Sequence, residues 1–124
     1  MRAMIAWWDL TESAHDAGSL RGFLREEAEQ NWSKVPGLLL KFWISDPETN
    51  RWGAVLLWES EEAALAARPH LPRSAGELIG LPLEFRKWFD VEATVEGGHG
   101  LPSFSGLGPA LGADEGGASE EETF

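Results

Sequence analysis

The chain has 124 residues, no cysteine and a formal net charge of −11 at pH 7. The length predicts one domain with its own core, and the lack of cysteine excludes disulfides, thiolate nucleophiles and cysteine zinc sites. The negative charge opposes nucleic-acid binding, because a phosphate-binding face needs clustered lysines and arginines. No apolar run reaches the roughly 18 residues of a membrane span, and no signal pattern opens the chain. We therefore expect a cytoplasmic protein that binds neither nucleic acid nor a membrane.

The first two predicted elements are a strand and a helix. Residues 2–10 form a short apolar run with polar ends, which favours a buried strand. Residues 11–18 contain loop and helix-start residues, and Pro36-Gly37 ends the helix that follows. Within that helix, apolar residues recur at a spacing of three and four, opposite a charged side. They are Leu20, Phe23, Leu24, Ala28 and Trp32.

A hairpin follows the helix. Residues 38–45 and 51–59 are predicted strands, and residues 46–50 between them have turn composition. Alternation divides the first of these strands into two faces. One face holds Leu38, Leu40, Phe42 and Ile44, and the other holds Leu39, Lys41, Trp43 and Ser45.

The second half of the predicted domain has a broken helix and a last strand. Ser60 is placed to cap a helix that starts at Glu61, and two prolines, Pro69 and Pro72, then interrupt it. Capping-box spacing between Ser74 and Glu77 predicts a second helical piece before Gly80. Residues 82–93 are the fourth predicted strand.

The order of elements is βαββαβ. It predicts an α+β fold over residues 1–95, a ferredoxin-like sandwich in which both helices cover one face of an antiparallel sheet. The face that helices leave open is normally polar, yet the last three predicted strands have large apolar residues on both faces. Since monomers avoid exposed apolar patches of that size, we expect a homodimer formed through the open face.

The composition changes at residue 96. Residues 96–124 hold eight of the fourteen glycines, six acids and no base. This composition predicts an acidic, glycine-rich flexible tail outside the domain. The alternative is that its few large apolar residues dock across the dimer or over a pocket mouth. These residues are Leu101, Phe104, Leu107 and Leu111.

Several local strings resemble a known family. They are Pro36-Gly37 followed by Lys41-Phe42-Trp43-Ile44-Ser45, then Gly53-Ala54-Val55-Leu56-Leu57, then Glu61 through Ala67 with His70 soon after, and Phe89-Asp90-Val91. Over about residues 3–95 the chain resembles the dimeric α/β-barrel superfamily and, within it, the YdhR-like monooxygenases. The resemblance implies a homodimeric oxidoreductase that uses no flavin and no metal. It also implies a small aromatic or polyketide-like substrate.

A cofactor-independent oxygenase needs an aromatic-lined cavity, a proton acceptor and a cation that holds the substrate anion. We predict His70 as the base or donor, and Arg86 and Lys41, which lie between apolar neighbours, as anion-holding groups. The predicted substrate wall is formed by tryptophans: Trp7, Trp8, Trp43, Trp58 and Trp88. Each residue also has a purely structural interpretation: a helix-end histidine, cations in surface ion pairs, and core or interface tryptophans.

Fold alone does not select a reaction, and two further functions stay open beside the enzyme. One is a non-catalytic dimeric module that binds an apolar small molecule. The other, a haem-binding relative, is disfavoured by the negative charge and by the positions of the three histidines. Convergence of His70 with Arg86 or Lys41 in one cavity favours chemistry, whereas a purely apolar cavity favours binding.

Overall fold

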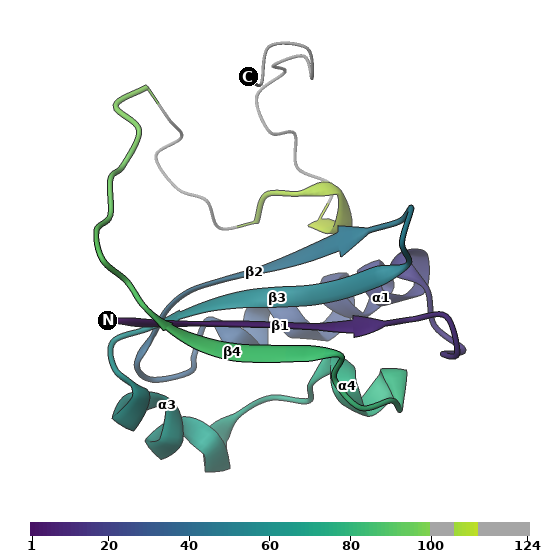
Figure 1. Ribbon diagram of the computed structural model, residues 1–124, viewed down its shortest axis with the longest axis horizontal. Helices are drawn as coiled ribbons and strands as arrows, with labels where there is room; N and C mark the ends of the chain where they lie inside the picture. The colour runs from purple at the N-terminus through teal and green to yellow at the C-terminus, as the bar shows by residue number, and fades with distance from the viewer. Residues whose placement is uncertain (100–105, 112–124) are drawn as a thin grey trace.

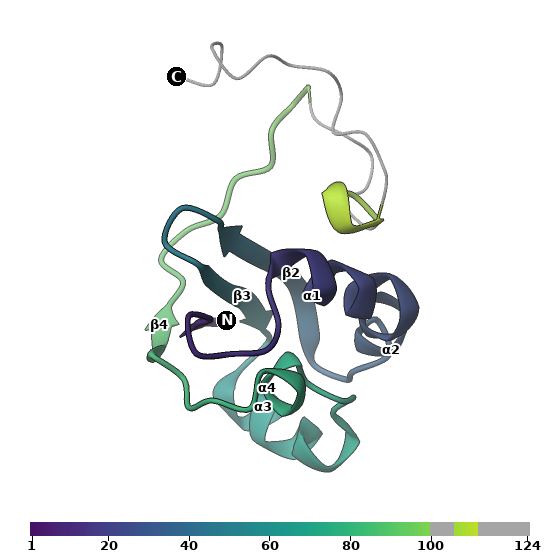
Figure 2. The ribbon, with the colours of Figure 1, turned by 90° about the vertical axis from the view of Figure 1, so that its right-hand side faces the viewer.

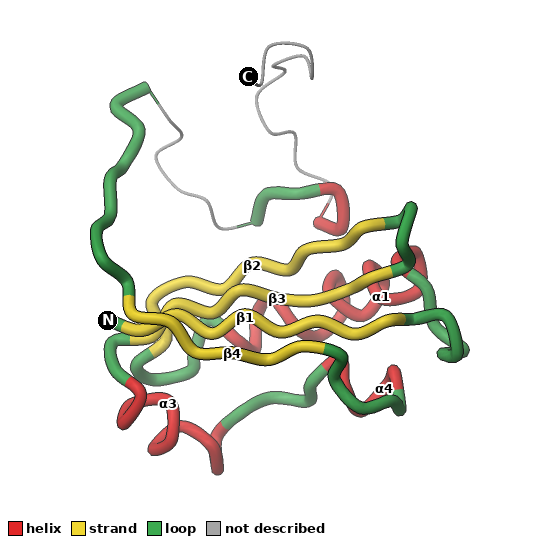
Figure 3. The backbone as a smooth tube through the Cα atoms, viewed as in Figure 1, coloured by secondary structure: helices red, strands yellow, loops and turns green. Residues whose placement is uncertain are grey.

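The sheet has four strands, all antiparallel. In this computed structural model, which describes residues 1–99 and 106–111 and omits the side chains of residues 27–29, the strand order is β2-β3-β1-β4 (Figure 3). The strands are β1 (Arg2–Asp9), β2 (Leu38–Asp46), β3 (Arg51–Trp58) and β4 (Phe85–Asp90). This order and the helices between the strands confirm the predicted ferredoxin-like arrangement. The last strand is shorter than the predicted 82–93, since its pairing with β1 stops at Trp7 opposite Phe85.

Two helical segments lie on the same side of the sheet (Figures 1 and 2). The first runs from α1 (Ala17–Phe23) through a π-helical stretch, η1 (Leu24–Ala28), into α2 (Glu29–Trp32). It begins at Asp16, whose side chain accepts a hydrogen bond from the backbone N–H of Ser19. The predicted helix is therefore present, although its 3.6-residue periodicity did not reveal the wider π turn.

The second helical segment is broken, as the two prolines predict. It consists of α3 (Glu61–Ala67), a 3₁₀ turn, η2 (Arg68–His70), and α4 (Ala75–Ile79). The Ser60 hydroxyl accepts a hydrogen bond of 3.0 Å from the N–H of Ala63, which confirms the predicted cap. Ser74 instead uses its backbone carbonyl to accept from Glu77, so the second helix is confirmed without the predicted capping box.

The core lies between the sheet and the helices. Its members face one another because β3 turns every second residue toward the helices. Its members include Trp52, Leu56 and Trp58 of β3 and Leu20, Phe23, Leu24 and Trp32 of the first helical segment. Ala28, predicted in the same stripe, belongs to the stretch whose side chains are not described.

A bulge near the start of β2 changes the predicted division of its faces. Leu38 pairs with Trp58 and Leu40 with Leu57, so Leu39 is an extra residue. Such an insertion turns the preceding side chain to the other face. Leu38 consequently packs against the core instead of lying with Leu40 on the open face.

The face of the sheet opposite the helices is apolar, as the sequence predicts. Leu40, Phe42, Ile44 and Phe89 leave 42, 47, 39 and 37% of their surface exposed. Trp7 also belongs to this face and stacks on Phe85, with the ring centroids 4.1 Å apart. We call this surface the open face; its pairing with a second copy stays a prediction.

Part of the predicted tail lies against the domain. Residues 106–111 include the 3₁₀ turn η3 (Pro109–Leu111). They contact the first helical segment and lie beside β2 (Figure 1). Gly106 and Gly108 have φ of +80° and +106°, a region that glycine adopts without strain. Of the four residues predicted to dock, Leu107 and Leu111 are in this segment, whereas Leu101 and Phe104 lie outside the described residues.

Candidate functional site

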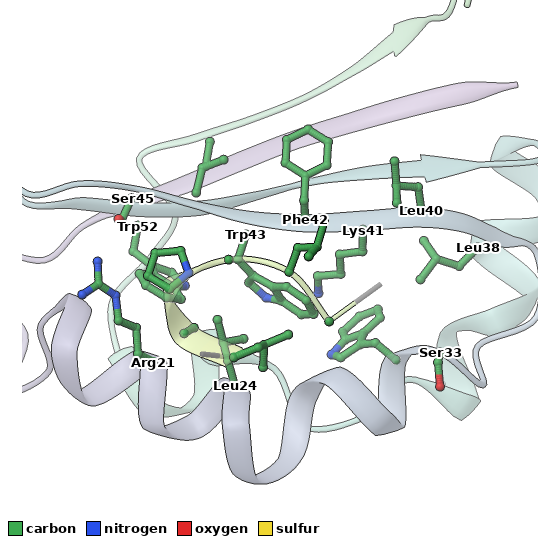
Figure 4. Close-up of a pocket in the computed structure, with 18 of the residues that line it drawn as sticks. Arg21, Leu24, Ser33, Leu38, Leu40, Lys41, Phe42, Trp43, Ser45 and Trp52 are labelled. Atoms are coloured by element: carbon green, nitrogen blue, oxygen red, sulfur yellow. The ribbon is translucent and has the colours of Figure 1, made fainter. Parts of the chain in front are cut away.

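A pocket of about 840 Å³ lies between β2, the first helical segment and residues 106–111 (Figure 4). Its walls are mainly apolar and aromatic, a composition typical of small-molecule sites. The aromatic part comes from two layers of the fold, because β2 and β3 supply one side and the end of α2 the other. Those residues are Trp32, Trp43 and Trp52, whereas the Phe42 ring on β2 points away, to the other face of the sheet (Figure 4).

Lys41 is the basic group at the centre of this pocket. Its strand position turns the side chain inward with Trp43, toward the helices, so the amine is enclosed by aromatic rings (Figure 4). Nζ lies 3.2 Å from the ring centroid of Trp32 and 4.8 Å from that of Trp43. Burial lowers the pKa of Lys41 from 10.5 to about 7, while the two indole faces oppose this by stabilising the ammonium form.

The polar groups of the pocket wall are positive or neutral. Arg21 lies at one end of the pocket and Ser33 at the other, with Lys41 between them (Figure 4). Among the described lining residues there is no aspartate or glutamate, although the whole chain has 21 acids and 10 bases. The pocket is therefore a basic site in an acidic protein, and it favours an anionic ligand.

The pocket wall also contains an unpaired donor. The indole N–H of Trp52 is buried and has no hydrogen-bond acceptor among the described residues. An unmade hydrogen bond of this kind costs roughly 1–3 kcal/mol. The desolvated amine of Lys41 lines the same pocket, so two polar groups there could be satisfied by a ligand.

Such a lysine has two chemical uses. With a pKa of about 7 it is present in both protonation states near neutral pH, so its amine can accept a proton. After protonation, the ammonium can hold the anion that remains, in surroundings that screen charge poorly. The aromatic rings around it match a flat ligand in shape.

The structure does not bring the three predicted polar residues together. Lys41 lines the pocket on β2, whereas Arg86 belongs to β4, at the opposite edge of the sheet. Arg86 is exposed, and its Nε lies 3.3 Å from the sulfur of Met4. His70 is exposed at the end of η2 and does not line the pocket.

The five predicted wall tryptophans lie in different surroundings. Trp43 lines the main pocket, and Trp7 lines a smaller hollow of about 440 Å³ on the open face. Trp8 donates to the Leu81 carbonyl at 3.1 Å, Trp58 is buried in the core, and Trp88 lies beneath the Arg2 guanidinium at 5.8 Å. Three residues that do line the pocket were not predicted from the sequence: Arg21, Trp32 and Trp52.

The hollow at Trp7 is bordered by an ion-pair cluster. Arg51 contacts Glu84 at 2.9 Å and Asp9 at 3.5 Å, and the Trp7 indole donates to Glu84 at 2.9 Å. The hydrogen bonds from Arg51 and then Trp7 lower the pKa of the Glu84 carboxyl. Because its one arginine is already paired with two carboxylates at the surface, the cluster offers an anionic ligand less than the main pocket does.

Within residues 1–99 and 106–111, no group of three or more histidine, aspartate or glutamate side chains is arranged to hold a metal ion. No helix in the same part of the chain is long and apolar enough to cross a bilayer.

The architecture and pocket define a ferredoxin-like α+β domain with a basic, aromatic ligand site. A solved structure with a similar fold is a single-residue variant of SnoaB, a cofactor-independent oxygenase from Streptomyces nogalater. The two chains superpose with a TM-score of 0.51 and 18% sequence identity, over 76% of this chain and 95% of SnoaB. No protein-family model and no curated protein matches the sequence.

Proposed function

We propose that this chain is an oxygenase that needs no cofactor and acts on a small, flat, phenolic substrate bound beside Lys41. The observation that supports this most is the amine of Lys41, buried against Trp32 and Trp43 in a pocket without a carboxylate among its described lining residues. An amine with a pKa near 7 can deprotonate a phenol and then hold the phenolate. The pocket volume suits one small aromatic molecule.

The proposed reaction uses dioxygen as the oxidant and the substrate as the electron source. Lys41 takes the phenol proton, and the phenolate reduces dioxygen and forms a carbon–oxygen bond at a ring carbon that carries hydrogen. The resulting peroxide takes its proton from the Lys41 ammonium. Loss of the ring proton then breaks the O–O bond and releases water. Overall, one phenol and one dioxygen give one quinone and one water, so electrons and atoms balance without flavin or metal.

The fold supports the superfamily part of this assignment. The fold shared with SnoaB agrees with the resemblance to the dimeric α/β-barrel superfamily, in which we place the chain. We further propose a YdhR-like monooxygenase type, on the sequence strings around Lys41-Phe42-Trp43 and Gly53. Because superfolds host many reactions, the chemistry rests on the pocket and not on the fold.

Self-association belongs to the same proposal. The open face exposes Leu40, Phe42 and Ile44 on an edge strand and Phe89 on the other edge, so the apolar surface spans the sheet. A second copy placed face to face would bury these side chains. We propose a homodimer formed through this face, with the pockets on the opposite, helix-covered side of each sheet.

The second candidate is a non-catalytic binding module. The observation that favours it is the distance in the fold between Lys41 on β2 and the other predicted polar residues, His70 and Arg86. A pocket with Lys41 as its one group that titrates near neutral pH among the described lining residues can bind an aromatic anion without transforming it.

Oxygen consumption separates the two functions. The wild-type protein is mixed with a panel of phenols and hydroquinones, and dissolved oxygen and quinone absorbance are followed together. We expect turnover of at least one compound and a loss of about 10²-fold or more in Lys41→Met, the usual scale for a general base. Lys34→Met is the matched control, because Lys34 is exposed and does not line the pocket.

Two other outcomes would contradict the oxygenase or favour the binding module. Equal turnover in Lys41→Met and wild type would contradict the proposed chemistry. Tight binding of a phenol, with no oxygen consumption by any compound in the panel, would instead support the binding module.

A further inference from the structure

Residues 106–111, which we call the C-terminal strap, form one wall of the aromatic pocket. All six line it, opposite residues of β2 and beside Leu24 of the first helical segment (Figure 4). They are separated in sequence from the last strand by residues 91–105, so the strap returns to the domain from a distance. A predicted tail thus supplies part of the candidate site.

The composition of the strap differs from that of the tail around it. The strap itself carries no charge, whereas five acids follow it in residues 112–124 and Glu96 precedes it. Its residues are Gly106, Leu107, Gly108, Pro109, Ala110 and Leu111. The part of the tail that crosses the pocket is therefore the part without charge. A carboxylate in this position would pair with Lys41 or Arg21 and compete with an anionic ligand.

The strap has a defined backbone conformation but few contacts that hold it to the domain. Two glycines with positive φ and a 3₁₀ turn give it a defined path. Among the described residues, one side-chain hydrogen bond joins it to the domain, from Nη1 of exposed Arg25 to the Ala110 carbonyl at 3.1 Å. Ala110 packs against the core, but its side chain is only a methyl group. Segments with so few buried apolar contacts open more easily than the core beneath them.

We propose that the C-terminal strap is a lid: it opens to admit a ligand to the Lys41 pocket and closes over the ligand afterwards. This inference goes beyond the proposed oxygenase, because a lid acts in the same way on a substrate and on a ligand that is only bound. It assigns residues 106–111 to the site, and it implies that the rate of ligand exchange is set by opening of the strap.

Single cysteines can report on the lid, because the chain has none of its own. Leu24 lines the pocket beside the strap and is 5% exposed, so the thiol of Leu24→Cys should react only when the strap opens. Leu20 lies one turn earlier on the same helical segment, is 0% exposed and does not line the pocket. The thiol of Leu20→Cys should therefore report opening of the domain itself.

Both reporters are placed in the full chain and treated with an aromatic disulfide reagent, 5,5′-dithiobis(2-nitrobenzoate). The strap is loosened by Leu107→Ser with Leu111→Ser or, separately, by Arg25→Met, which removes the hydrogen bond to Ala110. Val95→Ser is the control, since Val95 is 95% exposed and lies outside the strap. We expect the Leu24→Cys thiol to react about ten-fold faster or more in the loosened chains, with the Leu20→Cys rate unchanged.

Two results would overturn the lid. Equal acceleration of both thiols would show that the strap holds the whole domain together. An unchanged rate at Leu24→Cys in both loosened chains would show that the strap does not cover the pocket. Neither readout involves turnover, so failure of the lid and failure of the oxygenase proposal are distinguishable.

Discussion

Replacing Lys41 with methionine tests whether the pocket truly holds a desolvated amine. Methionine keeps an unbranched apolar chain between Trp32 and Trp43 and removes the charge. Burial lowers the pKa of Lys41 from 10.5 in the unfolded chain to about 7 in the folded one. The ammonium form is therefore a cost to folding, and Lys41→Met should remove that cost.

The size and the sign of the effect follow from the two pKa values. Between pH 7 and 10.5 the unfolded chain holds a proton on Lys41 that the folded chain has released, so stability rises with pH in this window. Each unit of pKa difference corresponds to about 1.4 kcal/mol, which sets an upper limit of roughly 5 kcal/mol. Attraction between the ammonium and the two indoles returns about 0.5–2 kcal/mol of this.

Urea unfolding followed by tryptophan fluorescence measures the effect at pH 6, 8 and 10. We expect Lys41→Met to be more stable than wild type by a few kcal/mol at pH 6, and the difference to fall toward zero by pH 10. The chain has no tyrosine and no cysteine, so few other side chains titrate in this range. One protein concentration is used throughout, because a dimer makes stability depend on concentration. Parallel pH curves for the two proteins would refute the buried amine.

Three further predictions address the rest of the molecule. Gly53→Ala should lower the free energy of unfolding by about 1–3 kcal/mol, because a Cβ there would meet the Ala6 carbonyl and the Trp7 side chain; Gly22→Ala, with open space around it, should be neutral or slightly stabilising in the same urea experiment. Phe42→Asp on the open face should convert the dimer to monomer in sedimentation, whereas Leu65→Asp on α3 should not, and a dimeric Phe42→Asp protein would rule out that interface. His70→Ala should keep turnover within a few-fold of wild type, because His70 does not line the pocket; a loss of about 10²-fold would instead restore His70 as the general base.

The fold was predictable because its signals are local. Alternation on the strands, the Ser60 cap and the breaks at Pro69 and Pro72 each depend on neighbours a few residues away. The exposed Phe42 and the inward Trp43 follow from alternation alone. Alternation failed at Leu38, where a bulge inserts one residue, and nothing in the run Leu38-Leu39-Leu40 marks which leucine is extra.

The candidate site was only partly predictable because it depends on contacts between distant elements. Lys41 interrupts an apolar strand, and this local signal led to its selection. Periodicity places Trp32 in a helical stripe, but its position over the Lys41 amine follows from packing of α2 on β2, which periodicity does not specify. Arg86 looks equivalent to Lys41 in sequence, but β2 and β4 are opposite edges of the sheet.

The strap shows a similar limit. Glycine and acid content predict a flexible tail over residues 96–124. Because composition is an average over the whole segment, it does not reveal the uncharged stretch within it. Leu107 and Leu111 indicated that docking was an alternative. Their position over the pocket depends on the path of the chain, which composition does not specify.

The proposed function depends on the ionisation of Lys41, which NMR of the lysine side chains measures directly. Protein labelled with ¹³C in lysine is titrated from pH 5 to 11, and Lys41→Met identifies the Lys41 Cε signal. We expect a pKa of about 7 for Lys41 in the free protein, and a higher pKa once a phenol binds, because the phenolate stabilises the ammonium. A Lys41 pKa near 10.5 that no phenol changes would contradict both the buried amine and the function proposed for it.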